Sequence, residues 1–302
     1  MEETKVYERQ DLLRLEAKDG SPIDALLVTS KHEKMRDVIK APMLLQLHGL
    51  LGHFLARGTP RLLPHALLKY GYSSMSINTR LAFAGQITGK GIFDDTIYDI
   101  DAAIKFLQYE GFRNIFILGY SLGASMLVNW AAKREHAKVR GLILEGVHHA
   151  IPDSQKKDFT KWGSTPSYEE IYEKAKKILG NDPYNSPNDE TFVVCQSRGP
   201  NHTPSSSEIF TYKTWWFMTG PEAVSARAHQ HIDKIKIPVL MLRGEGDFLI
   251  EGWEPEALSK ILREAGNKHV RVREIKGAKH DCMENPDQML EEIHTMLSKF
   301  SK

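Results

Sequence analysis

The chain of 302 residues has little cysteine, no long apolar segment and almost no net charge. Its two cysteines, Cys195 and Cys282, have no metal-ligand or redox spacing, which argues against a disulfide-stabilised secreted fold. No apolar run approaches the roughly 18 residues that a membrane-spanning helix needs. The polar start Met1–Lys5 also lacks the apolar core of a signal peptide. These absences predict a soluble cytoplasmic protein.

The sequence also lacks an excess of charge of either sign, because 40 Lys and Arg residues nearly balance 39 Asp and Glu residues. No overall field would therefore recruit nucleic acid or an anionic membrane. Histidines 148, 149, 229 and 231 lack nearby carboxylates or cysteines at metal-ligand spacing, so we expect no metal site. No glycine-rich phosphate motif is present either, so we expect no cofactor. Nothing in the sequence indicates an oligomeric state.

The most informative stretch is Gly119-Tyr120-Ser121-Leu122-Gly123. It follows the apolar run Ile115–Leu118, typical of a buried parallel strand, and precedes a helical pattern from Leu122 to about His136. A serine between two glycines at a strand-to-helix turn matches the nucleophile elbow, in which a sharp, strained turn exposes the hydroxyl at a helix N-terminus. The backbone N–H groups there favour a developing negative charge. Taken alone, the pattern fits a simple tight turn equally well.

Strand and helix patterns alternate before and after this stretch. Val6 to Thr29 resembles two strands joined at Asp19-Gly20, and a charged linker follows at 31–40. The further strands expected are 42–47, 72–78, 115–118, 139–145, 237–242 and 270–275. The helices expected are 59–71 with Thr59 as cap, 94–110, 122–136, 255–265 and a final helix to Phe300 with Asn285 as cap. This alternation predicts an α/β fold with a mostly parallel sheet and helices on both faces.

The alternation stops at residues 151–231. This segment contains one convincing helix, Ser167–Leu179, with a capping box formed by Ser167 and Glu170. An insertion of this kind is typical of a cap or lid, so we divide the chain into a core of 1–150 and 232–302 and a cap of 151–231. Its aromatic cluster at Trp215, Trp216 and Phe217 either forms the interior of the insertion or, with Phe248, lines a substrate pocket.

Three residues that acyl transfer requires follow predicted strands at their carboxyl ends: Ser121, Asp247 and His280. Those ends meet at one edge of a parallel sheet, so the three side chains can converge although they are distant in sequence. Glu145 is an alternative acid, and Glu245 fits the position less well.

Rival groups for the base and the nucleophile fit less well than His280 and Ser121. His148 and His149 follow the wrong strand to supply the base, and we interpret them as lid contacts or surface groups. Cys282 has no elbow of its own, so a passive neighbour is the better interpretation.

The order serine, acid, histidine, together with the His48-Gly49 loop, the elbow, Gly244–Asp247 and Gly277–His280, resembles the α/β-hydrolase superfamily of serine hydrolases. The resemblance covers about 10–150 and 232–300, and it is strongest to esterase-like and lipase-like members with a cap between the sixth and seventh core strands. It implies that Ser121 is the nucleophile, His280 the general base and Asp247 the residue that orients His280. It also implies that the backbone N–H groups of Leu122 and Leu50 form the oxyanion hole.

The function expected from this resemblance is cleavage of a small-molecule carboxylic ester through an acyl-serine intermediate, without a cofactor. The same triad would serve a thioesterase, lactonase, amidase or carbon–carbon bond hydrolase. A second class of function also stays open, namely a hydrolase-like receptor that binds a ligand with little turnover.

Overall fold

A mostly parallel sheet forms the centre of the molecule. The computed structural model describes residues 7–31, 35–85, 91–135, 138–197 and 206–301. Within them, an eight-stranded sheet has the order β1-β2-β4-β3-β5-β6-β9-β10. The strands from β4 to β10 pair in parallel, and the hairpin β1–β2 joins one edge in the antiparallel sense. The alternating sequence pattern therefore predicted the type of sheet correctly.

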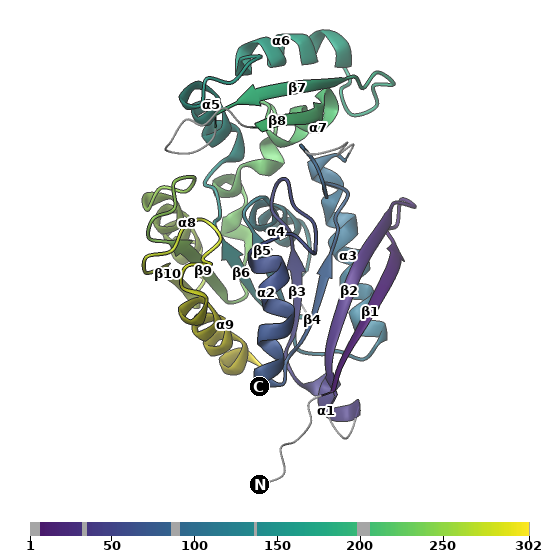
Figure 1. Ribbon diagram of the computed structural model, residues 1–302, viewed down its shortest axis with the longest axis vertical. Helices are drawn as coiled ribbons and strands as arrows, with labels where there is room; N and C mark the ends of the chain where they lie inside the picture. The colour runs from purple at the N-terminus through teal and green to yellow at the C-terminus, as the bar shows by residue number, and fades with distance from the viewer. Residues whose placement is uncertain (1–6, 32–34, 86–90, 136–137, 198–205, 302) are drawn as a thin grey trace.

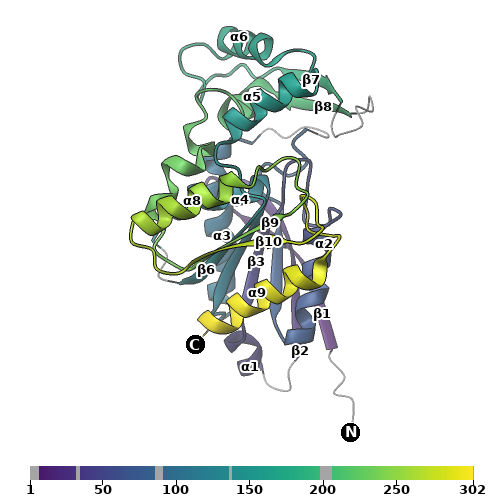
Figure 2. The same cartoon turned by 90° about the vertical axis from the view of Figure 1, so that its left-hand side faces the viewer.

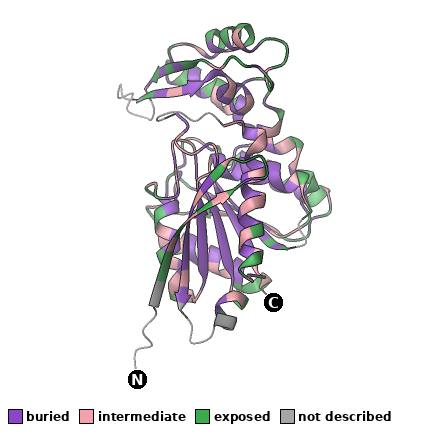
Figure 3. Cartoon of the chain, turned by 90° about the vertical axis from the view of Figure 1, so that its right-hand side faces the viewer, coloured by how far each residue is buried: buried purple, intermediate pink, exposed green. Residues whose placement is uncertain are grey.

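The strands lie close to where the sequence placed them. The hairpin consists of β1 (Tyr7–Glu16) and β2 (Pro22–Lys31). The parallel strands are β3 (Met43–Leu47), β4 (Ser73–Ile77), β5 (Ile115–Tyr120), β6 (Val139–Glu145), β9 (Val239–Gly244) and β10 (Val270–Ile275). The central strands are buried along almost their whole length, whereas the hairpin at the edge is partly exposed (Figure 3).

Helices cover both faces of the sheet (Figure 1). One face holds α3 (Thr96–Tyr109), α4 (Leu122–Lys133) and α8 (Trp253–Glu264), and the other holds α2 (Thr59–Ala66) and α9 (Pro286–Phe300). Successive strand residues point to opposite faces, so they supply two cores. Leu45 and Ile117 pack in the core of the first face, and Leu44 and Phe116 pack in that of the second.

Residues 151–231 form an insertion between β6 and β9 that lies above the carboxyl ends of the parallel strands (Figures 1 and 2). Its main elements are α5 (Ile151–Lys161), α6 (Tyr168–Leu179), β7 (Thr191–Gln196), β8 (Ser206–Thr211) and α7 (Tyr212–Met218). Three short 3₁₀ turns, η3 (Val224–Ala226), η4 (Ala228–Gln230) and η5 (Ile232–Lys234), return the chain to β9. The expectation of a single helix in this segment is therefore incomplete.

The chain enters and leaves the insertion at adjacent points. His149 precedes α5 and His229 lies in η4, and their rings stack with centroids 4.3 Å apart and an interplanar angle of 1°. The backbone N–H of His229 donates to the carbonyl of His149 at 3.1 Å. A second link joins the insertion to the core, because Ile209 of β8 forms a β-bridge with Gly85. The insertion thus contacts the rest of the chain where it begins and ends, and again through β8.

Two local expectations need correction. The charged linker contains a short helix, α1 (Met35–Lys40), which buries Val38. Thr59 does not cap α2: the cap position belongs to Gly58, and Thr59 is the first helical residue. The helix does continue as the 3₁₀ turn η1 (Leu67–Tyr70) up to Gly71, as expected.

A further 3₁₀ turn, η2 (Phe93–Asp95), leads into α3. Val6 and His136, placed by the sequence at the ends of a strand and a helix, lie outside the described residues. None of the helices in the described part of the chain combines the length and apolar character that a bilayer crossing requires.

Candidate active site

Ser121 lies at the turn from β5 to α4 in a strained backbone conformation. Its φ of 54° and ψ of −117° are rare for a residue with a side chain. A Cβ atom on Gly119 would lie 2.3 Å from the carbonyl oxygen of Gly123, and one on Gly123 would lie 2.6 Å from that of His48. Both positions therefore require glycine, which accounts for the spacing of the motif.

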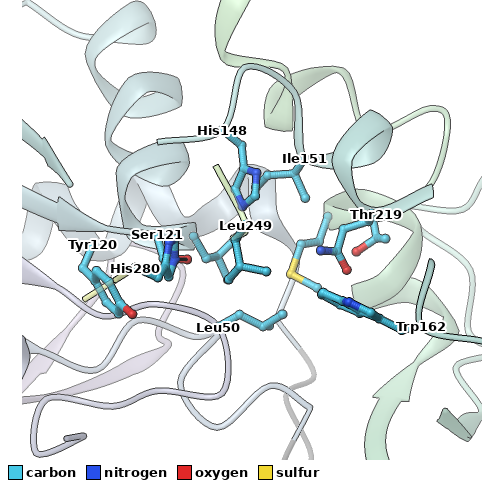
Figure 4. Close-up of a pocket in the computed structure, with 12 residues that line it drawn as sticks. Leu50, Tyr120, Ser121, His148, Ile151, Trp162, Thr219, Leu249 and His280 are labelled. Carbon is cyan, nitrogen blue, oxygen red and sulfur yellow. Dashed lines mark hydrogen bonds between the residues drawn. The ribbon is translucent and has the colours of Figure 1, made fainter. Parts of the chain in front are cut away.

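A chain of hydrogen bonds joins Ser121, His280 and Asp247. Nε2 of His280 lies 2.9 Å from Oγ of Ser121, and Nδ1 of His280 lies 2.8 Å from Oδ2 of Asp247. Asp247 comes from the loop after β9 and His280 from the loop after β10, so three separate strand ends meet here. The Asp247 side chain is fully buried and that of His280 is 10% exposed. The structure thus brings together the three residues that the sequence singled out, and Figure 4 shows Ser121 and His280 side by side.

Asp247 is held as a carboxylate by its hydrogen-bond donors. Its Oδ1 accepts from the backbone N–H groups of Leu249 at 2.9 Å and Ile250 at 3.1 Å. Burial raises the pKa of Asp247, but the hydrogen bonds from His280 and from these N–H groups outweigh it and leave the pKa below its ordinary value. A negative charge therefore faces Nδ1 of His280 at neutral pH.

Glu145, the alternative acid, lies elsewhere in the network. It is fully buried at the end of β6, and its Oε1 accepts from the hydroxyl of Thr59 at 2.7 Å. Burial raises the pKa of Glu145 to about 8, so the carboxyl group is mostly protonated at neutral pH.

The hydroxyl of Thr59 lies between Glu145 and the loop that carries His280. The Thr59 hydroxyl also lies 3.2 Å from the carbonyl oxygen of Asp281, and it has only one hydrogen to donate. The Thr59 hydroxyl donates to Oε1 of Glu145 at 2.7 Å, so the carbonyl of Asp281 is its more distant acceptor. Glu245, the weaker alternative, accepts instead from the backbone N–H of Gly277.

The His48-Gly49 loop lies against Ser121. A Cβ atom on Gly49 would lie 3.2 Å from Cβ of Ser121. Burial lowers the pKa of His48 to about 4, so its ring is neutral. Its Nδ1 donates to the carbonyl of Gly49 at 2.9 Å, and Nε2 accepts from the N–H of Thr79 at 3.2 Å. The carbonyl and N–H of a trans peptide point in opposite directions, so this bond sets the orientation of the Leu50 N–H.

A cavity of about 170 Å³ opens beside Ser121. Leu50 lines it from the His48-Gly49 loop, and Leu122 lines it as the first residue of α4, where N–H groups have no helical acceptors. The remaining walls come from the core and the insertion and consist of Tyr120, His148, Ile151, Gln155, Trp162, Met218, Thr219, Leu249 and His280 (Figure 4).

The aromatic residues proposed for a pocket lie elsewhere. Trp215 is 1% exposed and packs edge-on against Tyr168 in the interior of the insertion, and Trp216 stacks on Tyr172. Phe217 packs against the ring of Tyr184.

Phe248 instead lines a second cavity of about 180 Å³. His149, Lys157 and Trp253 line the same cavity. The residues lining the cavity beside Ser121 therefore include none of these four aromatic side chains.

His148 is the functional candidate that the sequence interpretation missed. It is 6% exposed, and its ring points into the cavity (Figure 4). Burial, together with the nearby His280, lowers the pKa of His148 to about 3, so the ring is neutral. Its position three residues beyond β6, at the edge where the strand ends meet, is the signal that points to it. Cys282 differs, because burial raises the pKa of its thiol and so disfavours the thiolate needed for attack.

Solved structures share this fold at low sequence identity. The esterase Pf2001 of Pyrococcus furiosus is 16% identical, with a TM-score of 0.66 over 97% of this chain and 92% of that chain. Est1E from Butyrivibrio proteoclasticus is 18% identical, with a TM-score of 0.56 over 94% and 99% of the two chains. The α/β hydrolase GrgF from Penicillium sp. sh18 is 10% identical, with a TM-score of 0.70 over 97% and 99%.

Sequence comparison is decisive at the level of the family. No curated protein matches the sequence. The model of one family, described as serine aminopeptidase, S33, matches residues 71–287, which is more than half of the chain. The protein therefore belongs to the serine aminopeptidase S33 family and, with it, to the serine hydrolases of the α/β-hydrolase superfamily.

Proposed function

We propose that the protein hydrolyses carboxylic esters through an acyl-serine intermediate. The observation that carries this proposal is the unbroken hydrogen-bonded chain from Asp247 through His280 to Ser121, with distances of 2.8 Å and 2.9 Å. In this role Ser121 attacks the ester carbonyl, and Nε2 of His280 accepts the serine proton. Asp247 holds the imidazole in the required tautomer and stabilises its charged form.

The oxyanion that forms during attack needs donors that already point at it. We assign this role to the backbone N–H groups of Leu122, at the start of α4, and Leu50, whose peptide is oriented by His48. His280 then protonates the departing alcohol. In the second half of the reaction it activates a water molecule that releases the acid from Ser121. No cofactor enters this scheme.

The lining of the cavity favours an ester over the free amino terminus of a peptide. A peptide amino terminus is an ammonium ion, and a buried cation needs a carboxylate partner. Neither Asp nor Glu occurs among the described residues that line the cavity beside Ser121. One of the similar solved structures, Pf2001 of Pyrococcus furiosus, is described as an esterase, which supports the same choice.

We further propose that residues 151–231 act as a cap on a core of 1–150 and 232–302. Ile151, Gln155, Trp162, Met218 and Thr219 all belong to this segment, and all line the cavity. A substrate bound at Ser121 would therefore contact both parts of the chain, and the cap would limit its size. Specificity would depend on the cap, and the chemistry would depend on the core.

The test is covalent labelling with a fluorophosphonate probe, together with turnover of 4-nitrophenyl acetate. The native protein is expected to be labelled and active, and Ser121→Ala is expected to lose both properties. Ser125→Ala, one turn later in α4, is the matched control and keeps both. Labelling that survives Ser121→Ala would contradict the assignment.

Other reactions are separated by the choice of substrate. A panel of thioesters, lactones and aminoacyl 4-nitroanilides tests the reactions open to the same three residues. Tight binding of esters without turnover would instead favour a ligand-binding receptor.

A further inference from the structure

The cavity beside Ser121 contains a polar side chain that the proposed ester hydrolysis does not use. His148 is 6% exposed, and its Nδ1 has no hydrogen-bond partner in the described part of the chain. A buried polar atom without a partner is unfavourable, and proteins retain few of them. Nδ1 is enclosed by protein, whereas Nε2 is accessible and also has no hydrogen-bond partner among the described residues; because the ring points into the cavity, a bound molecule can form a hydrogen bond with Nε2 (Figure 4).

The ring of His148 is suited to a neutral polar group. An uncharged imidazole has one N–H donor and one acceptor nitrogen, and burial keeps the pKa of His148 at about 3. It can therefore donate to a carbonyl oxygen, or form one hydrogen bond with a hydroxyl group, as donor or as acceptor. A charged ligand group would find no partner of opposite charge, because none of the described cavity-lining residues is Asp, Glu, Lys or Arg.

The size of the cavity limits what can occupy it. Its volume is about 170 Å³, and an apolar cavity of roughly 150 Å³ in another protein accommodates benzene. Leu50 and Leu249 contribute apolar walls, and Gln155 and Thr219 add polar atoms from the insertion. A single ring with one oxygen substituent matches this combination of volume, apolar wall and isolated polar groups.

We infer that the cavity takes an uncharged, ring-sized part of the ester, and that His148 forms a hydrogen bond with a hydroxyl or carbonyl oxygen on that part. This inference rests on the proposed ester hydrolysis and adds the class of substrate. His148 is here a specificity residue that touches the substrate and takes no part in the proton transfers of His280.

Two series of esters test the inference. The first has the ring on the acyl side, as 4-nitrophenyl benzoates, and the second has it on the alcohol side, as phenyl acetates. Each ring carries either a hydroxyl or a methyl group at position 2, 3 or 4. At one position of one series, the native protein is expected to prefer the hydroxyl ester in kcat/KM by about tenfold. The series that shows the preference identifies the side of the ester that enters the cavity.

His148→Phe keeps a ring in the cavity wall but removes its hydrogen-bonding atoms. For each variant, kcat/KM for the hydroxyl ester is divided by kcat/KM for the methyl ester. Dividing this ratio by the corresponding ratio of the native protein cancels the intrinsic reactivity of the esters. The preference is expected to disappear in this variant, because kcat/KM for the hydroxyl ester falls about tenfold more than kcat/KM for the methyl ester. His148→Gln, which retains hydrogen-bonding atoms, is expected to recover part of the preference and gives a second measurement if the Phe variant does not fold.

The neighbouring residue supplies the matched control. His149 stacks on His229 and lines the second cavity, so His149→Phe is expected to keep the preference for the hydroxyl ester. An equal loss for both esters in His148→Phe, or no hydroxyl preference in either series, would overturn the inference. Fluorophosphonate labelling of Ser121 is measured in parallel, so a failure of the proposed esterase function is recognised separately by the absence of labelling.

Discussion

Two buried acids at the ends of neighbouring strands differ in protonation: one is a carboxylate and the other is mostly neutral. Asp247 follows β9 and Glu145 ends β6, and these strands pair directly in the sheet. The pKa of Asp247 is below its ordinary value, because donors outweigh burial, whereas burial raises the pKa of Glu145 to about 8. The difference lies in the donors: Asp247 has His280 and two backbone N–H groups, while Glu145 has the hydroxyl of Thr59 and the weak donor thiol of Cys282. The hydrogen-bond donors therefore distinguish these two buried acids: they outweigh burial at Asp247 and do not outweigh it at Glu145.

The comparison suggests a division of roles. In the proposed reaction, a carboxylate beside His280 favours the imidazolium that forms when Ser121 loses its proton. A second carboxylate at Glu145 would lie close to Asp247 and Asp281, and both raise its pKa. We therefore expect Asp247 to support the reaction, and a neutral Glu145 to support the loop that carries His280 through Thr59 and Asp281.

The largest expected effect comes from Asp247→Asn. The amide cannot hold the imidazole in the tautomer that accepts the serine proton, so kcat for 4-nitrophenyl acetate should fall by about 10⁴-fold. Glu245→Gln is the matched control in the same loop, and it is expected to change kcat by less than about twofold. A loss below about tenfold for Asp247→Asn would show that the two acids do not differ in the way described.

Glu145→Gln sharpens the comparison through stability. In the native protein Glu145 keeps its proton up to about pH 8, while its ordinary pKa is 4.5. The folded state then binds more protons than the unfolded state between these values, so the free energy of unfolding falls as the pH rises through this window. The fall is on the order of a few kcal/mol, since each pKa unit corresponds to about 1.4 kcal/mol.

The neutral glutamine cannot ionise, so the variant should lack this component. The measurement is urea denaturation of both proteins at pH 4, 6 and 9. As the pH rises, the free energy of unfolding of Glu145→Gln should increase relative to that of the native protein. Parallel curves for the two proteins would show that Glu145 is already ionised in the folded state.

The smallest effect is expected from Thr59→Val, which removes the hydroxyl next to Glu145 at nearly constant volume. A buried carboxyl that loses its partner should lower the free energy of unfolding at pH 7 by about 1–2 kcal/mol. Thr160→Val, at an exposed threonine of α5, should change it by less than about 0.5 kcal/mol. The free energies of unfolding are measured by urea denaturation. Equal decreases for the two substitutions would show that the hydroxyl of Thr59 does not stabilise Glu145.

Much of the core could be predicted because its signals are local. The elbow combines an apolar strand, two required glycines and a helix within a few residues. The capping box of Ser167 with Glu170 and the Asn285 cap are also confirmed, since a cap depends on residues three positions apart. The meeting of Ser121, Asp247 and His280 followed from a general property of parallel sheets, not from any contact visible in the sequence.

The insertion and the cavity were harder to predict, because their signals are spread over distant segments. Ile151, Trp162 and Met218 come from different elements, and none has a distinctive sequence context. The β7 strand alternates between buried and exposed positions, but its exposed side carries the apolar Val193, which hides the alternation. Thr59 matched a helix cap locally, yet Glu145, distant in sequence, provides the partner of its hydroxyl.

The stacked pair His149 and His229 has a consequence for the exchange of parts between related proteins. Because the two ends of the insertion lie side by side, a segment of different length or sequence can start and end there without moving β6 or β9. The entropy of closing a loop grows only slowly with its length, so a longer or shorter insert changes the stability of the core little. This junction is therefore the natural crossover point for chimaeras that test the proposed role of the insertion in substrate preference and leave Ser121, Asp247 and His280 untouched.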